Sequence, residues 1–103
     1  MGKGIAPGQE KQDLERIPWV GPSIAQDLLD LGIRSVDDLV DEDPEELFER
    51  LCALRHERID RCVLYVFRSS VYWAGAELPD PELSKWWNWK DGGPARRIAD
   101  GSA

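Results

Sequence analysis

A short segment near the start of the chain, residues 17–21 (IPWVG), most strongly constrains the fold. Pro18 ends a preceding helix and disfavours helical angles at the residue before it, and Gly21 provides a position without a Cβ where the chain must turn sharply. Pro22 then suits the first turn of a new helix, and Ser23 is a residue type that caps free amides. The segment therefore predicts a tight turn between two helices.

The helix expected after this turn has a hydrophobic stripe and a free N-terminus. Ile24, Leu28 and Leu31 recur at helical spacing, and Gly32 follows as the expected stop. The free amides at its start, together with the positive end of the helix dipole, form a site for an anion. A phosphate group is thus the first ligand to consider.

This turn and its helices resemble the helix-hairpin-helix element, in which a turn of pattern Pro-Gly-hydrophobic-Gly holds a nucleic-acid phosphate on backbone amides. Two positions depart from that pattern. Trp19 stands where the first glycine is usual, and Pro22-Ser23 stand where DNA-binding members often carry lysine or arginine. The resemblance implies DNA as a partner; the alternative is that the hairpin only packs two helices.

The rest of the chain also reads as helical, because no segment shows the alternation and turn chemistry of paired strands. We expect helices over residues 10–17, 22–31, 36–40, 44–53 and 59–74, and a further short helix after Pro81. Ser35 and Asp38 have the spacing of a capping box for the third of these. The expected fold is a compact all-α domain of five to six helices over residues 10–91, with flexible segments at 1–9 and 92–103.

The order of these helices is also that of a paired helix-hairpin-helix domain, similar to a sterile alpha motif (SAM-like). In this interpretation residues 54–58 (LRHER) form a degenerate second turn that has no glycine but contains two arginines and a histidine. One intact and one degenerate hairpin would then contact two phosphates by different means.

Charge is unevenly distributed on a chain that is acidic as a whole. The 103 residues include 20 acidic and 13 basic side chains, a formal charge of −7 that repels DNA at long range. Residues 23–49 carry ten acidic and one basic side chain, whereas residues 50–68 carry five arginines and two acids. Either one face of the molecule is basic, or these two segments pair with each other.

The last long helix has two faces of different character. Its apolar face is expected to pack in the core and contains Ile59, Cys62, Val63, Val66, Phe67 and Ser70. A second stripe interleaves arginine and tyrosine, namely Arg58, Arg61, Tyr65, Arg68 and Tyr72. Such a stripe suits phosphate contact with ring stacking. Alternatively, the arginine stems cover apolar surface and their charged groups pair with the acidic segment.

A tryptophan-rich string occupies residues 81–91 (PELSKWWNWKD). Leu83, Trp86 and Trp87 share one face of the short helix expected there and would close the core. The alternative is a stacking platform or partner-binding patch in which Trp89, with its neighbouring lysines, stays exposed.

Enzymatic and metal chemistry find little support in the sequence. Cys52, His56 and Cys62 lack an evident fourth zinc ligand, and His56 is the single histidine. The carboxylates of residues 37–49 read as a solvated face, and no glycine-rich nucleotide loop is present. We expect no catalytic activity, metal or cofactor. Since no apolar run reaches the length of a membrane span and residues 1–9 lack a signal-peptide core, we expect a cytoplasmic protein with no membrane partner.

The stretch from about residue 14 to residue 91 resembles a small bacterial family of pathogenicity-locus helix-hairpin-helix proteins, also called mitomycin-resistance proteins. The segments that carry this resemblance are residues 17–18, 20–21, 31–36, 43–47, 60–68 and 85–91. The first half is also similar to the C-terminal domain of the TfoX competence regulators. The resemblance implies a DNA-binding helical domain of undetermined role.

Two functional hypotheses follow. In the first, the chain binds the DNA backbone without sequence specificity through the amides of the first turn and nearby arginines. The candidate contact residues are Arg16, Trp19, Val20, Gly21, Ser23, Ile24, Arg58, Arg61, Tyr65 and Arg68. In the second, it is a SAM-like adaptor that binds a protein partner or a second copy of itself and no nucleic acid.

Overall fold

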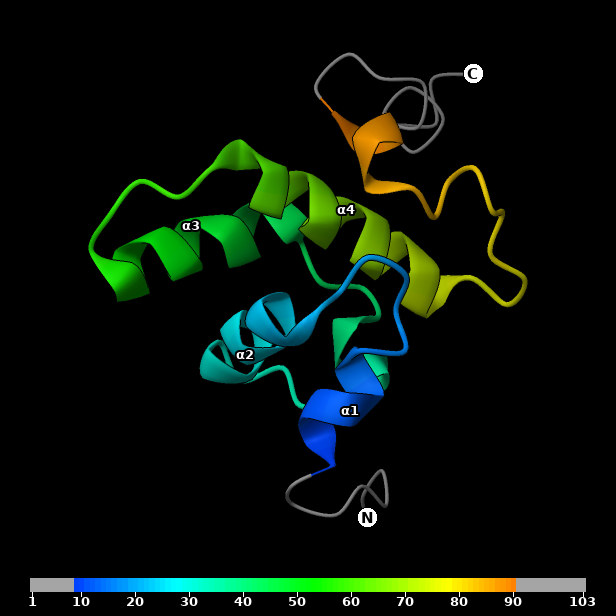
Figure 1. Cartoon of the computed structure of the whole chain (residues 1–103), viewed down its shortest axis with the longest axis horizontal. Helices are drawn as coiled ribbons and strands as arrows, with labels where there is room; N and C mark the ends of the chain where they lie inside the picture. Colours follow the sequence, from blue (N-terminus) through cyan, green and yellow to red (C-terminus); the bar gives the residue numbers. More distant parts are fainter. Residues whose placement is uncertain (1–8, 91–103) are drawn as a thin grey trace.

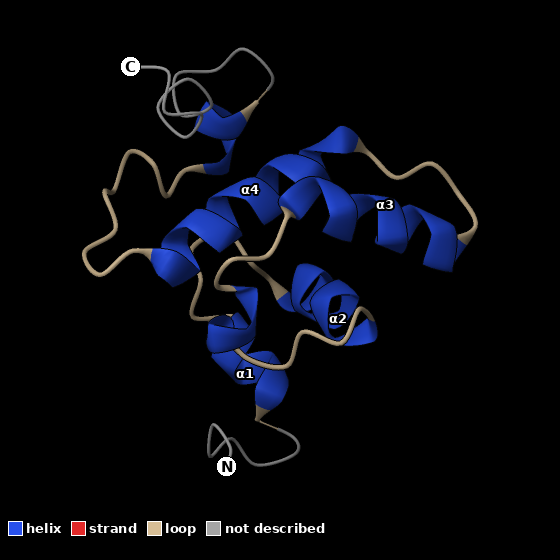
Figure 2. Cartoon of the chain, turned by 180° about the vertical axis from the view of Figure 1, so that it is seen from behind, coloured by secondary structure: helices blue, strands red, loops and turns tan. Residues whose placement is uncertain are grey.

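The computed structural model describes residues 9–90, and over that range its regular secondary structure consists of helices joined by turns and loops (Figures 1 and 2). The expectations for residues 1–8 and for the tail from residue 91 onward therefore lie outside the described part of the chain. Four α-helices and two short 3-10 helices follow one another in the order α1 Glu10–Leu14, α2 Pro22–Asp30, η1 Val36–Leu39, α3 Pro44–Arg55, α4 Arg61–Gly75 and η2 Trp86–Trp89. The all-α prediction is confirmed for these residues.

Local capping chemistry explains where α3 and α4 begin. The carboxylate of Asp43 accepts hydrogen bonds from the amides of Glu45 and Glu46, at 3.0 and 3.4 Å. Asp60 likewise accepts from the amide of Cys62 at 2.9 Å, so α4 begins two residues later than the sequence predicted. Each helix thus starts directly after an aspartate that satisfies its first free amides.

The first helix is shorter than predicted, because α1 ends at Leu14 instead of continuing to residue 17. The amides of Arg16 and Ile17 bond to carbonyls three residues back, at 3.1 Å each, so the chain tightens into turns before it reaches Pro18. Ile17 is nevertheless buried. The shorter helix brings the chain into the turn without exposing this apolar residue.

Helix α4 is the central element of the fold. It contacts α3, η1 and η2, and Figures 1 and 2 show α1 and α2 on one side of it and η2 on the other. The completely buried aliphatic and aromatic side chains come from five elements or their flanks: Leu14, Ile17, Leu28, Leu39, Leu47, Leu51, Leu64 and Phe67. Burial of this set supplies most of the driving force for folding.

Two details of the expected core and caps are wrong. Cys62 is exposed, and Leu64 takes a core position instead, because the buried face of α4 is rotated toward residues 64–70. The predicted capping box does not form either. The Ser35 hydroxyl makes no cap hydrogen bond, and the amide of Val36 is bound at 2.9 Å by Asp13 of α1.

No helix in the described range is long and apolar enough to cross a membrane.

Candidate functional site

The turn between α1 and α2, residues 17–21, is held by a hydrogen bond from the Val20 amide to the Ile17 carbonyl at 3.1 Å. We call it the first turn. Pro18 occupies its second position and Trp19 its third, where the backbone has a positive φ of 71°. A turn of this kind normally takes glycine at that position, because a Cβ there costs about 1–2 kcal/mol. The bulky Trp19 is therefore held in a strained conformation.

The glycine of this turn has a different role from the one predicted. Gly21 is the N-cap of α2 with φ −92° and ψ −173°, extended angles that any residue can adopt, and a Cβ added there would meet no atom within 4 Å. The conformational freedom of glycine is needed at position 19, not at position 21. What Gly21 contributes is an N-cap without a side chain.

The start of α2 consequently presents unused amide groups. Pro22 has no N–H, and the Ala25 amide donates to the Gly21 carbonyl at 2.9 Å. The amides of Ser23 and Ile24 have no acceptor among residues 9–90, because neither a capping side chain nor an acidic residue lies in the first turn of α2. The start of α2 thus differs from those of α3 and α4, where an aspartate binds the first amides.

Val20 does not belong to this donor set. Its side chain is in the core, and its amide is already bound to Ile17. The predicted role of the Val20 amide in anion binding is therefore incompatible with the geometry. Of the amides predicted over residues 20–24, only those of Gly21, Ser23 and Ile24 remain available.

An exposed group of indole rings lies beside the first turn. The ring centroids of Trp19 and Trp87 are 5.0 Å apart, with an interplanar angle of 72°, and Trp86 packs against Trp87 at 5.8 Å. Trp19 is 54% exposed and Trp87 38% exposed. We call these three residues the tryptophan cluster. The Nζ atom of Lys85 lies 5.9 Å from the centroid of the Trp87 ring.

Two tryptophans of the tryptophan-rich string differ from their predicted exposure. The sequence predicts Trp87 in the core, and the alternative places Trp89 at the surface. Trp89 is only 5% exposed, its indole N–H donates to the Leu83 carbonyl at 2.6 Å, and its ring packs against Tyr72. Trp89 therefore closes the core, whereas Trp87 is the ring that remains at the surface. Sequence reasoning missed the pairing of Trp19 with Trp87 because the two lie far apart in the chain and no local pattern links them.

The arginine and tyrosine stripe on α4 is only partly accessible. The guanidinium carbons of Arg61 and Arg68 lie 5.9 and 5.6 Å from the centroid of the Tyr65 ring. Arg68 is buried and donates to Glu45 of α3 and to the Trp89 carbonyl, each at 2.8 Å. The prediction that Arg68 contacts phosphate is therefore wrong, because its charge is already engaged inside the fold.

Other cations of the basic segment also pair with the acidic segment. Arg55 bonds to Asp27 at 2.7 Å and to Asp30 at 2.8 Å, and Arg50 donates to the Leu31 carbonyl at 2.8 Å. The hydrogen bond from Arg55 lowers the pKa of Asp30. Segment pairing, one of the two alternatives for the uneven charge, is thus confirmed for Arg55 and Arg68.

The turn between α3 and α4 covers residues 56–60 and not 54–58 as predicted, because Leu54 and Arg55 belong to α3. We call it the second turn, and it differs chemically from the first turn. His56 caps α3 with a positive φ of 58°, and Glu57 donates its amide to the Cys52 carbonyl. The α4 amide that a phosphate would need is occupied by Asp60, whose pKa the hydrogen bond from the Cys62 amide lowers. The second turn therefore lacks a free amide site of the kind found in the first.

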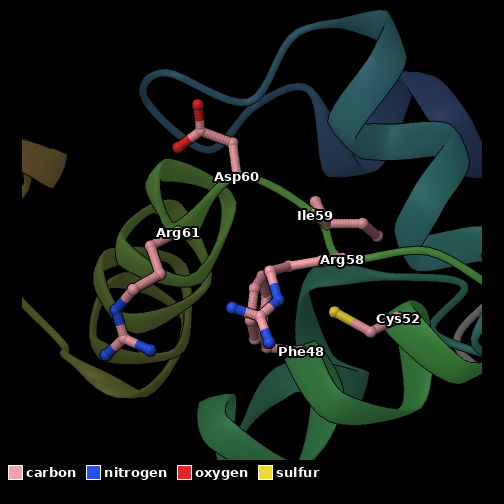
Figure 3. Close-up of a pocket in the computed structure, with 6 residues that line it drawn as sticks. All are labelled: Phe48, Cys52, Arg58, Ile59, Asp60 and Arg61. Atoms are coloured by element: carbon pink, nitrogen blue, oxygen red, sulfur yellow. The ribbon is translucent and has the colours of Figure 1, made fainter.

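A pocket of about 640 Å³ lies at the second turn, lined by Phe48, Cys52, Arg58, Ile59, Asp60 and Arg61. Figure 3 shows the Arg58 guanidinium beside Phe48 in the space between α3 and α4, while Arg61 points away from Cys52. Arg58 and Arg61 are both exposed. Within residues 9–90, no three cysteine, histidine or carboxylate side chains gather into a group suited to a metal ion.

Arg16 is the cation nearest in sequence to the first turn. Its side chain is 59% exposed and pairs with Asp13 at 3.1 Å. The Arg16 end of this pair is in water, whereas the Asp13 side chain is 16% exposed and also accepts from the Val36 amide. An ion pair with one solvated partner adds little net stability, so Arg16 can contact another anion.

Comparison with known proteins places the whole described fold in one family. The model of the pathogenicity locus family matches residues 8–94, which include both turns. The chain is also 35% identical over 77 residues to a mitomycin resistance protein, McrB, from Streptomyces lavendulae, covering 75% of this chain and 70% of that protein. No solved structure gives a significant match. On these two matches, the chain belongs to the pathogenicity locus family.

Proposed function

We propose that this chain binds the nucleic-acid backbone, with the first turn and α2 acting as a helix-hairpin-helix phosphate site. The observation that carries the proposal is the start of α2, where the amides of Ser23 and Ile24 have no acceptor among the described residues. Together with the helix dipole, these donors favour an anion. Unlike α3 and α4, which are capped by aspartates, α2 has neither a capping side chain nor an acidic residue in its first turn.

Three further groups complete the proposed site. Arg16 lies just before the first turn, and its own side chain is exposed although it pairs with the half-buried Asp13. Arg58 and Arg61 are exposed at the second turn, with Tyr65 beside Arg61, and would contact a second stretch of backbone. Because the chain carries a net charge of −7, we expect weak, non-sequence-specific binding that falls steeply with added salt. The proposal involves binding without catalysis and fits the cytoplasmic location expected from the sequence.

The decisive test replaces Gly21 with aspartate. The Gly21 backbone is extended and has open space for a side chain, so aspartate there is expected to cap Ser23 and Ile24 as Asp43 caps α3. The variant should be at least as stable as the parent and should lose phosphate binding. Gly21→Ala is the matched control, because it adds a Cβ without a carboxylate.

Binding would be measured by fluorescence anisotropy with short labelled oligonucleotides over a salt series. We expect Gly21→Asp to weaken binding about tenfold or more, corresponding to about 1.4 kcal/mol, while Gly21→Ala binds like the parent. If Gly21→Asp and the parent bind with equal affinity, the phosphate does not bind at the start of α2. No binding by the parent at low salt would reject the proposal as a whole.

The competing proposal is a SAM-like adaptor that binds a protein or a second copy of the chain. The exposure of Trp19 and Trp87 and the excess of acidic side chains favour it. Sedimentation equilibrium separates the two functions. A concentration-dependent dimer combined with no affinity for oligonucleotides would support the adaptor.

A further inference from the structure

We infer that the tryptophan cluster makes the proposed site selective for unpaired nucleotides: Trp19 stacks on an exposed base while the neighbouring backbone phosphate lies on the α2 amides. This inference rests on the proposed function and specifies its substrate as single-stranded nucleic acid. It assigns a role to a surface that the helical scaffold does not need.

The Trp19 side chain contributes little packing to the fold, although its backbone conformation is strained. Its backbone has φ 71°, and over half of its side-chain surface remains in water. The hydrophobic face of the turn is supplied by its buried neighbours, Ile17 and Val20. An exposed aromatic ring on a strained backbone is typical of a ligand contact, where the ring is presented and not packed.

The contact with Trp87 fixes the ring without covering it. In an edge-to-face pair the edge of one ring meets the face of the other, so at least one broad face of Trp19 is left uncovered by Trp87. Trp86 also packs edge to face against Trp87, with ring centroids 5.8 Å apart. The cluster therefore holds the Trp19 indole in place as a stacking surface.

The polar groups around the cluster favour a nucleotide over an apolar partner. The free amides of α2 follow the first turn within a few residues. Two cations flank the cluster: Arg16, which pairs with Asp13, and Lys85, which lies 5.9 Å from the Trp87 ring and pairs with Glu82 at 2.9 Å. A ligand that matches both parts must combine a flat aromatic group with an anion. A nucleotide unit of a single strand has this composition, and base stacking on aromatic side chains is its usual mode of binding.

Duplex nucleic acid does not meet the same requirements. Its bases are stacked on one another and expose no face to Trp19, so only the phosphate contact remains. The indole then projects from the turn where a glycine would allow the backbone to approach. We therefore expect the parent chain to bind a single-stranded oligonucleotide more tightly than a duplex of the same length.

The test compares the parent with Trp19→Gly and Trp19→Phe on a labelled oligothymidine and on a duplex of equal length. Glycine accepts the positive φ and removes the ring, while phenylalanine keeps an aromatic face on the same backbone. Trp19→Gly should lose about tenfold in affinity for the single strand and keep or improve its affinity for the duplex. Trp19→Phe should retain most of the preference for the single strand. Circular dichroism checks that both variants are folded.

The results separate this inference from the proposed function. Duplex binding by the parent chain that is lost in Gly21→Asp would support the phosphate site. If the parent then shows no preference for the single strand, or if Trp19→Gly shows no selective loss of single-strand binding, the stacking role is overturned and the phosphate site is retained. Absence of binding to either oligonucleotide would overturn both. Loss of self-association in Trp19→Gly, with unchanged oligonucleotide binding, would assign the cluster to a protein interface instead.

Discussion

The buried guanidinium of Arg68 on α4 bonds to the carboxylate of Glu45 on α3, with the Nε atom 2.8 Å and a terminal nitrogen 2.6 Å from the same oxygen. A further nitrogen donates to the Trp89 carbonyl at 2.8 Å. One side chain thus ties the central helix to α3 and to η2. The two partners differ in environment, since the Arg68 side chain is 4% exposed and that of Glu45 is 43% exposed.

This difference predicts unequal effects of removing either partner. Glu45→Ala removes the carboxylate oxygen that accepts two hydrogen bonds from this buried cation and should destabilise the fold by about 3 kcal/mol. Arg68→Met fills a similar volume and leaves a carboxylate that water can solvate, so we expect a loss of about 1–2 kcal/mol, arising mainly at the Trp89 carbonyl. Urea denaturation measures both. A larger loss for Arg68→Met than for Glu45→Ala would contradict the argument.

Arg68 also shows what the periodicity of a sequence leaves open. The spacing correctly placed Arg61, Tyr65 and Arg68 along one stripe of α4, and the cation–π contacts confirm that they are neighbours. Whether that stripe faces water depended on η2, which covers its second half through contacts between residues about 20 positions apart. Local spacing carries no information on such long-range cover.

The strain at Trp19 predicts that glycine at this position gives a more stable protein than alanine, the reverse of the usual order. Trp19→Gly and Trp19→Ala both remove the indole and its contact with Trp87, but alanine keeps a Cβ at φ 71°. In most exposed positions alanine is more favourable than glycine by about 0.5–1 kcal/mol. Here we expect glycine to be the more stable of the two by about 1 kcal/mol. Thermal denaturation of the two variants tests this, and the usual order would show that the turn has relaxed.

A cap from a neighbouring helix replaces the predicted capping box at η1. The Ser35 hydroxyl is buried and has no hydrogen-bond partner among the described residues, while Asp13 binds the Val36 amide. Ser35→Ala should therefore leave stability unchanged or raise it by up to about 1 kcal/mol, although loss of a true serine cap would cost about 1 kcal/mol. Asp13→Ala should cost about 1–2 kcal/mol. Guanidinium denaturation measures the change in the free energy of unfolding for each variant. A clear loss of stability in Ser35→Ala would show that the Ser35 hydroxyl does cap η1.

The helix starts show which signals the sequence carries reliably. Pro22, and Pro44 after Asp43, marked the first residues of α2 and α3 correctly, because proline at the first helical position and an aspartate cap act within one turn. The donor set of the first turn was only partly predictable, because the Val20 amide is used inside the turn. The strain at Trp19 and its contact with Trp87 required the backbone angles and the path of the whole chain.

The thiol of Cys62 is predicted to react slowly despite its exposure. A hydrogen bond to Asp60 raises its pKa above the usual 9.0, so little thiolate forms at neutral pH. In a Cys52→Ser background, which leaves Cys62 as the single cysteine, Asp60→Asn should accelerate modification by a disulfide reagent. An unchanged rate would show that Asp60 does not control the thiol.

The paired aspartates predict how stability changes in acid. The pKa of Asp60 is lowered by the Cys62 amide and that of Asp30 by Arg55, both from a usual value of 3.8. A carboxyl group whose pKa is lower in the folded state stabilises the fold fully above the unfolded value, and this contribution is lost as the pH falls through the folded pKa. Stability should therefore decline as the pH falls below about 4.

Replacing these carboxylates should flatten that decline. Asp60→Asn retains a capping side chain without a titrating group, and Asp30→Asn removes one of the two carboxylates that Arg55 binds. Both variants should therefore depend less on pH between about 4 and 2 than the parent. Asp37→Asn is the control, since this exposed carboxylate makes no hydrogen bond or ion pair with any residue from 9 to 90. Urea midpoints measured across this pH range provide the comparison. If Asp37→Asn flattens the profile as much as Asp60→Asn, the acid sensitivity reflects net charge and not these specific contacts.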